Sequence, residues 1–372
     1  MRQSTRILFA WLVVAFTAGF YAPYATSANS AFCETRYEAI DLGTLDPFSH
    51  SVATAINNRG HVTGNSAATA FLWSCDKGLE NIGQSIGQPD NIGVALNDLD
   101  QVVVMAAPQY PNFSPDTFLW ERNKTLVVIE RNRTLDADAI TNAGIIASFD
   151  SLWSKATGFI PIELGVPIFR AHLTNLGRLG GIYFDEATSE ERLFTWTRRE
   201  GLKTLGPPLS DAVSTVDTND RGDLLVDASS TDLRTSYIMS RNGQTVMLPL
   251  RADVRSLYAT RTNLLREVIG TELALEVQPH GDRSRSFVWD PKRGFRNLNE
   301  LFDPVPGDPF DATSINDWGW IVGNRRDFNA SLLVPVPAHS RRYENLNRLR
   351  GPQLCRALVE VQVHRLLCGL GR

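Results

Sequence analysis

The sequence of 372 residues predicts an all-β fold assembled from repeated units, and three observations carry that prediction. Short apolar runs bounded by Gly, Asn, Asp and Pro are plentiful, whereas long helical patterns are scarce. The stretch AINNRGHVTGN (55–65) returns near the end of the chain as SINDWGWIVGN (314–324), with five of the eleven positions identical. Further strand-like segments follow these copies in a fixed order, which is typical of repeat architectures.

The first element of the unit is a turn in which Asn or Asp usually precedes Gly. Asn and Asp side chains cap their own backbone, and Gly supplies a positive φ. Two copies carry Asp100 and Arg266 at the glycine position, so we expect looser turns there. The copies recur about every 43 residues, close to the length of a propeller blade. The seven copies are AINNRGHVTG (55–64), ALNDLDQVVV (95–104), AITNAGIIAS (139–148), HLTNLGRLGG (172–181), DTNDRGDLLV (217–226), RTNLLREVIG (261–270) and SINDWGWIVG (314–323).

Two strand segments follow the turn. Together with the stretch that enters the turn and the strand that ends the turn copy, they give four short strands per unit, as propeller blades require. The sequence therefore predicts a seven-bladed β-propeller of four-stranded blades over residues 33–337. The first segment reads AFLW (70–73), TFLW (117–120), SLW (151–153), LFTW (193–196), SYIM (236–239), SFVW (286–289) and SLLV (331–334). The second reads GLENIG (78–83), TLVVIE (125–130), GFIPIEL (158–164), GLKTLG (201–206), GQTVMLPL (243–250) and GFRNLNEL (294–301).

The seventh unit lacks this last strand after residue 334. A segment with the same rhythm, YEAIDLGTL (37–45), stands instead at the start of the chain. A ring of sheets has an exposed edge wherever the chain ends, and pairing that edge with another strand of the chain removes it. We therefore predict that the N-terminal strand closes the last blade.

Recurring side chains have a structural interpretation. Large rings dominate the burial of β cores, so we expect the repeated tryptophans to pack between neighbouring blades. The turn asparagines are expected to shape the backbone rather than to act as catalytic amides. We expect His61 and His172, in or beside the turn, to be ordinary exposed side chains. The tryptophans are Trp73, Trp120, Trp153, Trp196 and Trp289, and the asparagines are Asn57, Asn142, Asn175, Asn219 and Asn316.

The segments INNRGHVTGNSAATAFLW and YEAIDLGTL resemble the HAF repeat of bacterial proteins described as extracellular. That repeat joins an Ile-Asn-x-x-Gly-x-Val-x-Gly turn to a His-Ala-Phe-Leu-Trp strand and a Gly-Leu/Met-x-Leu-Gly strand. Here Thr69 replaces the His that precedes Ala70 and Phe71, and the third to fifth units match less well. The resemblance implies secretion and repetition, and it brings no catalytic residues with it.

Residues 1–28 have the pattern of a signal peptide. Arg2 and Arg6 precede an apolar stretch (7–20) that is short for a membrane helix, and small residues (25–28) end at Ala28. The alternative is an uncleaved membrane anchor. We expect a secreted or periplasmic protein.

Charge is divided unevenly along the chain. Residues 29–337 carry 28 Lys and Arg against 39 Asp and Glu, a balance of −11, whereas residues 338–372 carry seven Arg against two Glu, a balance of +5. An acidic body argues against a nucleic-acid partner. The basic tail allows a short amphipathic helix or a strand over 355–367, which either packs on the propeller or touches a membrane surface.

The sequence offers no catalytic motif, so the catalytic residues stay unknown, and it indicates no cofactor. The six histidines are not spaced as metal ligands, and no P-loop, nucleophile elbow or calcium loop is present, so we expect no metal site. An even number of cysteines in an exported chain allows disulfides, but four cysteines permit three pairings. The cysteines are Cys33, Cys75, Cys355 and Cys368.

Loops of irregular length should fall on the face opposite the repeated turns, and variable loops on a rigid scaffold are where binding residues concentrate. These loops are 107–116, 184–192, 277–286 and 302–310. We expect them to contact a glycan or a protein partner through Tyr110, Phe113, Asp116, His280, Arg283 and Asp308.

Three functions fit these observations. The first is a secreted, non-enzymatic binding or interaction module at the cell surface. The alternative is a secreted carbohydrate-active enzyme, a glycoside hydrolase or polysaccharide lyase, that uses the face of the long loops. The third is a structural protein that binds further copies of itself. Convergence of ionisable side chains in one pocket would favour the enzyme. The candidates for such a pocket are His172, Tyr183, Asp185, His280 and Arg283.

Overall fold

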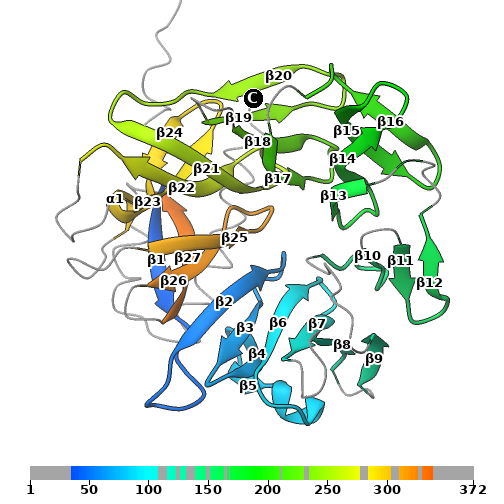
Figure 1. Ribbon diagram of the computed structural model, residues 1–372. Coiled ribbons are helices and arrows are strands. Elements are labelled where there is room, and N and C mark those ends of the chain that lie inside the picture. The colour runs from blue at the N-terminus through cyan, green and yellow to red at the C-terminus, as the bar shows by residue number, and fades with distance from the viewer. Residues whose placement is uncertain are drawn as a thin grey trace, which may run out of the picture.

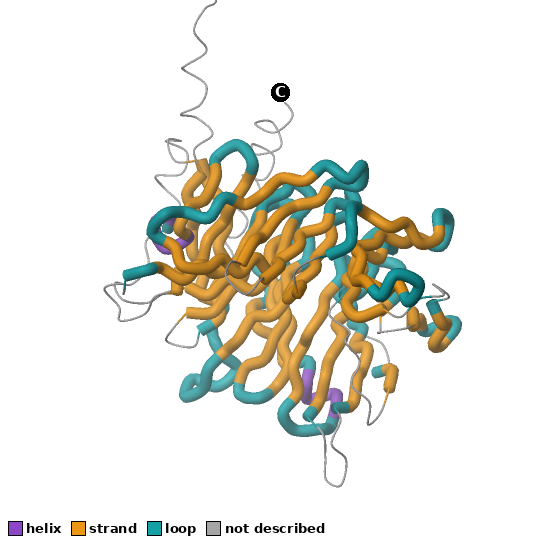
Figure 2. The backbone as a smooth tube through the Cα atoms, turned by 45° about the horizontal axis from the view of Figure 1, so that its top comes forward, coloured by secondary structure: helices purple, strands orange, loops and turns teal. Residues whose placement is uncertain are grey.

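Seven antiparallel sheets are arranged in a ring in the computed structural model (Figure 1), and we call the axis of this ring the channel. The predicted seven-bladed β-propeller is thereby confirmed, and the colours of Figure 1 follow the chain once around the ring. The tube in Figure 2 shows how completely strands dominate the molecule. The structure describes residues 35–107, 115–122, 126–130, 139–147, 151–162, 166, 168–209, 212–229, 234–276, 284–302, 310–325 and 329–337.

Every blade except the last runs from its innermost strand to its outermost strand in chain order. The first three blades are β2 (Ser51–Ile56), β3 (Val62–Ser66), β4 (Thr69–Ser74) and β5 (Gly78–Asn81); β6 (Asn91–Leu96), β7 (Val102–Ala106), β8 (Asp116–Trp120) and β9 (Val127–Glu130); and β10 (Ile146–Ala147), β11 (Ser151–Ser154) and β12 (Gly158–Pro161). In the third blade a single bridge between Ile140 and Ile146 takes the place of the innermost pairing. A 3-10 turn, η2 (Gly83–Ile86), follows the first blade.

The remaining blades have four strands each. They are β13 (Ile168–Leu173), β14 (Leu179–Asp185), β15 (Glu190–Thr197) and β16 (Gly201–Leu205); β17 (Ala212–Thr218), β18 (Leu224–Ser229), β19 (Arg234–Met239) and β20 (Thr245–Leu248); β21 (Val254–Thr262), β22 (Val268–Ala274), β23 (Ser284–Asp290) and β24 (Gly294–Asn297); and β25 (Phe310–Ile315), β26 (Ile321–Arg325), β27 (Ala330–Pro337) and β1 (Thr35–Asp41). One helical turn, α1 (Leu298–Leu301), follows the sixth blade.

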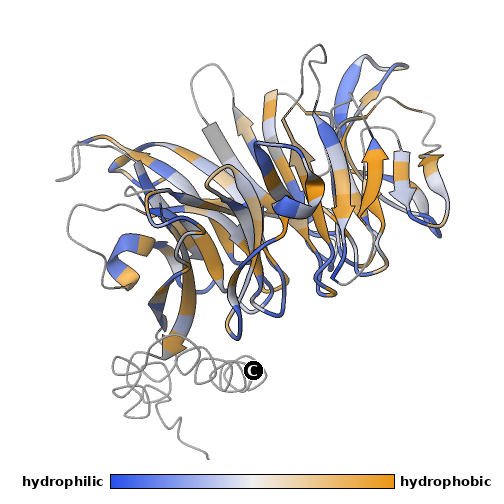
Figure 3. Cartoon of the chain, turned by 90° about the horizontal axis from the view of Figure 1, so that it is seen from below, coloured by the Kyte–Doolittle hydropathy of each residue, from blue (hydrophilic) through white to orange (hydrophobic). Residues whose placement is uncertain are grey.

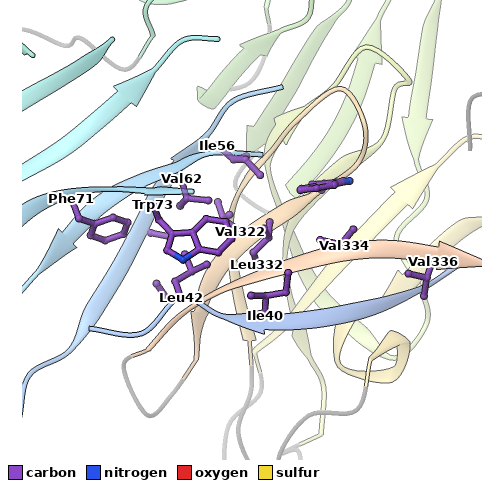
Figure 4. Packing of buried hydrophobic residues seen from close by; sticks show 13 residues of the cluster. Ile40, Leu42, Ile56, Val62, Phe71, Trp73, Val322, Leu332, Val334 and Val336 are labelled. Atoms are coloured by element: carbon purple, nitrogen blue, oxygen red, sulfur yellow. The ribbon is translucent and has the colours of Figure 1, made fainter. Parts of the chain in front are cut away.

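The ring closes as the sequence predicts. The N-terminal strand β1 pairs antiparallel with β27, in a register that runs from Thr35 opposite Pro337 to Asp41 opposite Ser331. Figure 4 shows the apolar cluster at this closure, where Trp73 of β4 lies beside Leu332 of β27 and Leu42. The first and last blades therefore share one hydrophobic core as well as neighbouring positions in the ring.

Hydrophobic packing between blades holds the ring together. Residues of adjacent blades share the buried clusters, and apolar segments occur on sheets all around the molecule (Figure 3). Trp153 packs against Leu119 of the second blade, and Trp289 packs against Leu225 of the fifth. Their indoles fill the space between sheets, as the sequence predicts for the repeated tryptophans.

The turns at Asp100 and Arg266 are not looser than the others, so that prediction is wrong. Both residues adopt a left-handed conformation with φ of 61°, and both keep the turn hydrogen bond, from Asp100 N to Asn97 O at 3.1 Å and from Arg266 N to Asn263 O at 3.0 Å. Side-chain bonds offset the backbone strain. Asp100 Oδ1 lies 2.6 Å from His61 Nδ1, and Arg266 binds both carboxylate oxygens of Asp223 at 2.8 Å.

Several expectations concern residues that the structure does not describe. The signal peptide (1–28) and the basic tail (338–372) lie outside the described residues. Cys75 is disulfide-bonded, and the other three cysteines also lie outside the described part. Within that part, no helix is both long enough and apolar enough to cross a membrane.

Candidate functional site

A pocket of about 170 Å³ opens into the channel on the face of the repeated turns. All seven blades contribute to its wall, because the innermost strand of each blade ends at such a turn. It lies on the face opposite to the one that the sequence predicts for ligand binding. The lining residues are Ile56, Asn57, Asn58, Leu96, Asn97, Asp98, Ile140, His172, Leu173, Thr174, Asn175, Thr218, Asn219, Asp220, Thr262, Ile315, Asn316 and Asp317.

The turn asparagines form a ring of hydrogen bonds around this pocket. The side-chain Oδ1 of Asn57 accepts from the backbone N of Arg59 and of His61, which fixes the turn. Its Nδ2 donates to the backbone carbonyl of Asn97 in the next blade at 2.8 Å. The same amide-to-carbonyl bond recurs from Asn97 to Thr141 at 2.8 Å and, each at 3.0 Å, from Asn219 to Asn263, from Asn263 to Asn316 and from Asn316 to Asn57.

Threonine interrupts this first ring at two blades. Thr141 and Thr174 stand at the asparagine position. The threonine side chain has a hydroxyl in place of the carbonyl oxygen but lacks the separate NH₂ group with which asparagine donates to the next blade. Each hydroxyl still accepts the local turn bond, from Ile145 N at 3.0 Å and from Arg178 N at 3.1 Å. Threonine therefore keeps the turn and loses the link to the next blade.

The next position of the turn forms a second ring. Its side chain accepts from a backbone N–H of the preceding blade, as Asp98 Oδ1 does from Asn58 N at 2.8 Å. Leu264 occupies this position in the sixth blade and cannot accept such a bond. The other bonds are from Asp98 N to Asn142, Asn142 N to Asn175, Leu176 N to Asp220, Leu264 N to Asp317 and Asp317 N to Asn58.

Three of these second-ring residues are aspartates, Asp98, Asp220 and Asp317, and each is half-buried. Burial raises the pKa of the Asp317 carboxyl, hydrogen bonds from Leu264 and Asn58 partly counteract this, and the charges of Asp220 and Asp98 raise it further. The described residues that line the pocket include no lysine or arginine. The pocket is therefore an anionic cup whose carboxylates repel one another.

A histidine and a buried carboxylate meet at the same channel wall. His172 Nδ1 lies 3.1 Å from Asp217 Oδ1, and Asp217 is 1% exposed. The other oxygen of Asp217 accepts from Thr262 N at 2.7 Å, which fixes the carboxylate. The hydroxyl of Thr262 is buried and has no hydrogen-bond partner among the described residues.

Exposed leucines stand at three of the seven turns that form the pocket wall. They stand at the tip of the turn, one residue after the second-ring position: Leu99 is 63% exposed, Leu176 is 79% exposed and Leu265 is 48% exposed. We call these three the leucine rim. The other tips carry Arg59, Ala143, Arg221 and Trp318, so five of the seven tips beside the anionic pocket are apolar and two carry an arginine.

The prediction that His61 and His172 are ordinary exposed side chains is wrong. Their side chains are 17% and 16% exposed, and each faces an aspartate, Asp100 and Asp217 respectively. A lone histidine in a repeated turn shows no such partner in the sequence, because the partner comes from the next blade.

The loop residues predicted to bind ligand are mostly undescribed. Tyr110, Phe113, His280, Arg283 and Asp308 lie outside the described residues, so these predictions stay predictions. Asp116 is described: it begins β8, is 9% exposed and accepts from Gln88 Nε2 at 2.7 Å.

Tyr183 and Asp185, the other described residues proposed for an enzymatic pocket, do not meet His172, whereas His280 and Arg283 lie outside the described residues. Tyr183 is buried within the fourth blade, where its hydroxyl lies 2.8 Å from Thr204 Oγ1. Asp185 ends β14 and pairs with Arg192 at 3.3 Å in the hairpin to β15. Strand β14 starts beside the turn that follows His172 and carries both residues to its far end. In the described part of the chain, no group of three or more His, Cys, Asp and Glu side chains is placed to hold a metal ion.

Sequence reasoning missed this pocket because its residues belong to the repeat. Repeated residues look architectural, and Asn57, Asn219 and Asn316 are indeed turn formers. For Asn142 and Asn175 that prediction is wrong, because their side chains accept from the preceding blade while a threonine holds the turn. The signal that could reveal the pocket is variation within the repeat. The second-ring position holds asparagine in three blades, aspartate in three and leucine in one. Asp98, Asp220 and Asp317 at this position predict a charged ring once the turns are known to face one channel.

Comparisons with known proteins support the fold. No protein-family model matches this chain, and no curated protein matches it. Among solved structures it is similar to a streptogramin B lyase, with a TM-score of 0.51 and 9% identity over 82% of this chain and 99% of the lyase. A structure of YCF48 bound to a D1 peptide gives a TM-score of 0.48 and 12% identity over 80% of this chain and 96% of that one. The Dos1 propeller gives a TM-score of 0.45 and 8% identity over 80% and 94%. The likeness to the lyase agrees with the seven sheets described above: the chain has a β-propeller fold.

Proposed function

We propose that this chain is an extracellular, non-enzymatic binding module whose ligand site is the channel mouth on the turn face. The ligand is a polypeptide segment in which an arginine or lysine side chain is flanked by apolar residues. The signal-peptide pattern and the resemblance to the HAF repeat support the extracellular location. One observation carries the binding proposal: the anionic cup lies inside the leucine rim.

Charge and shape both support such a ligand. A guanidinium group donates several hydrogen bonds in one plane and suits carboxylate acceptors. The pocket of about 170 Å³ is smaller than the roughly 300–1,000 Å³ of sites that enclose a whole small-molecule ligand. It therefore suits one side chain, while the leucines around it contact the residues on either side.

Binding of a short capped peptide tests the proposal. We expect a fluorescent Leu-Leu-Arg-Leu-Leu probe to bind the full chain in an anisotropy titration, and its Leu-Leu-Gln-Leu-Leu counterpart to bind far more weakly. Asp220→Asn should weaken binding of the arginine probe by about threefold to tenfold, since one opposing charge is lost. Asparagine can still accept from Leu176 N, so the bond between the fourth and fifth blades is kept, and the turn itself depends on Asn219.

Asp46→Asn is the matched control for charge. Asp46 is exposed, its carboxylate accepts from Phe48 N, and its loop precedes β2 and thus lies at the opposite end of that strand from the turn. Equal affinities for the two probes, or equal effects of Asp220→Asn and Asp46→Asn, would contradict the proposal.

The pH dependence of binding follows from Asp317. Because its pKa is raised by burial and by the neighbouring charges, this carboxyl takes up its proton at a higher pH than an ordinary aspartate. A cationic side chain favours the ionised form, so binding releases protons and affinity falls as the pH drops through the raised pKa. Asp317→Asn should flatten that part of the pH profile in the same titration.

A carbohydrate-active enzyme is the second proposal, and the pairing of His172 with Asp217 is the observation that favours it. Asp217 Oδ1 lies 3.1 Å from His172 Nδ1 without a hydrogen bond between them, and a small rotation of the ring would form that bond and orient the other nitrogen as a general base. We would measure release of reducing or unsaturated sugar from a panel of polysaccharides. Activity that His172→Asn abolishes, with binding of the arginine probe retained, would favour the enzyme; lack of activity on every polysaccharide would count against it.

A further inference from the structure

We propose that the C-terminal segment 338–372 of this chain docks onto its own channel mouth. Its arginines would then face the anionic cup, and its leucines would lie on the leucine rim. The inference rests on the ligand site of the proposed function and goes beyond it by naming an occupant that the chain itself carries.

The chemistry of the segment matches the mouth. It contains seven arginines, two glutamates and no lysine or aspartate, whereas residues 29–337 have an excess of 11 acidic residues. Its first apolar and basic run, LNRLR (346–350), places Arg348 between Leu346 and Leu349. This is the pattern of one cation flanked by apolar side chains that the mouth accommodates. Attraction between opposite charges also raises the rate at which the two surfaces meet.

The last strand delivers the segment to the correct face. Strand β25 runs toward the turn at residues 316–319, β26 runs away from it, and β27 runs toward the turn face again. Ile321, the first residue of β26 after the turn, pairs with Leu333. Residues 334–337 therefore continue beyond that level, and the chain leaves β27 on the face that carries the channel mouth.

The distance to be covered is short. Strand β27 is the third strand from the channel, two strand spacings away from β25, which amounts to about 10 Å. An extended chain covers up to about 3.3 Å per residue. The residues between Pro337 and Arg348 can therefore span about 30 Å, so the arginine reaches the cup without any change in the blades.

Docking of an arginine should lower the pKa of the Asp317 carboxyl. Burial raises the pKa of the Asp317 carboxyl and the charges of Asp220 and Asp98 raise it further; a guanidinium beside the three aspartates would reduce that second contribution. The segment would thus neutralise the cup until a stronger ligand displaces it, and the mouth would be selective for ligands that compete with an arginine.

Protection from trypsin tests the proposal in the full chain. Trypsin cleaves after Arg, and mass spectrometry can follow cleavage after Arg348 and Arg350. We expect cleavage there to become at least threefold faster in Asp220→Asn and in Leu176→Ser, and faster in the wild type at high salt. Asp46→Asn should behave as the wild type, and thermal melting should show that all these variants remain folded.

Two results would overturn the inference. One is equal cleavage of the segment in the wild type, in Asp220→Asn and in a synthetic peptide of residues 338–372. The other is protection that increases with protein concentration, because the segment would then dock on a second copy.

The full-chain variant Arg348→Gln/Arg350→Gln separates this inference from the proposed function. If the segment occupies the mouth, this variant binds the Leu-Leu-Arg-Leu-Leu probe more tightly than the wild type does. If both bind the probe with equal affinity, the site is real and the docking is wrong. If neither binds the probe, the proposed function fails.

Discussion

At the scale of single residues, the turn asparagine performs two separable tasks. Its carbonyl oxygen accepts from the backbone of its own turn, and its amide donates to the next blade. Asn57 shows both tasks, with bonds from Arg59 N and His61 N and a bond to Asn97 O. The threonines at the same position in the third and fourth blades perform only the first.

This division predicts unequal effects of two similar substitutions. Asn57→Thr should lower the free energy of unfolding by about 1 kcal/mol, the value of the lost hydrogen bond to Asn97. Asn57→Val has nearly the same shape but no hydroxyl, and it should cost about 2–3 kcal/mol because the backbone N–H groups lose their acceptor. Urea denaturation measures both, and equal losses would mean that the turn bond contributes nothing.

At the scale of the turn, each blade adapts to the side chain of its neighbour. At five junctions the residue after the glycine position reaches the glycine position of the next blade, whereas Gly177 has no such neighbour. Where that residue is the indole of Trp320, the next blade has Gly60, and a Cβ there would clash with the ring. Where it is His61, the next blade has Asp100, and the two side chains pair. A glycine that leaves room for the neighbouring side chain and a charged residue that pairs with it are thus two ways to accommodate the same contact between blades.

Gly60→Ala and Gly177→Ala separate the contact from the backbone. Both glycines have a positive φ, of 76° and 75°, but a Cβ on Gly177 meets nothing within 4 Å. Gly177→Ala should cost about 1 kcal/mol from backbone strain alone. Gly60→Ala should cost about 1–3 kcal/mol more, because the indole must move. Thermal unfolding of both variants gives the difference. Equal losses of stability would show that the Trp320 indole moves away from a Cβ at position 60 without an energetic penalty.

At the scale of the whole molecule, the ring makes every blade depend on two neighbours. Trp73 of the first blade shares a cluster with residues of β1, β26 and β27 at the closure. Loss of the hydrophobic contact between two neighbouring blades should therefore destabilise the whole ring, and no single blade should unfold alone.

Trp73→Ala should lower the free energy of unfolding by about 3–5 kcal/mol, as for other large buried rings, while unfolding remains one transition. Phe48→Ala is the control, since this ring is 97% exposed and its loss should change stability by less than about 0.5 kcal/mol. Circular dichroism and tryptophan fluorescence should report the same midpoint. Two separate transitions would contradict the cooperative ring.

The sequence predicts the number of blades and the closure because both depend on local patterns. The turn asparagine, the strand rhythm and the displaced strand at residues 37–45 are visible in the chain alone. The channel pocket is not, because its contacts join residues about 40 positions apart. Asp217 reaches His172 from the next blade, and neither residue carries a local sign of its partner. The strain at Asp100 and Arg266 was misjudged for the same reason.

The two rings of hydrogen bonds determine which junction between blades should separate first when the molecule is under mechanical force. Both rings contribute at the junctions between the sixth and seventh, seventh and first, first and second, and second and third blades. Among the described contacts, the remaining three junctions depend on one ring each. The doubly tied arc is the one in which the chain's ends meet and covalent continuity is missing. A tear in the propeller would therefore start on the opposite arc, between the third and sixth blades, where the backbone itself is unbroken.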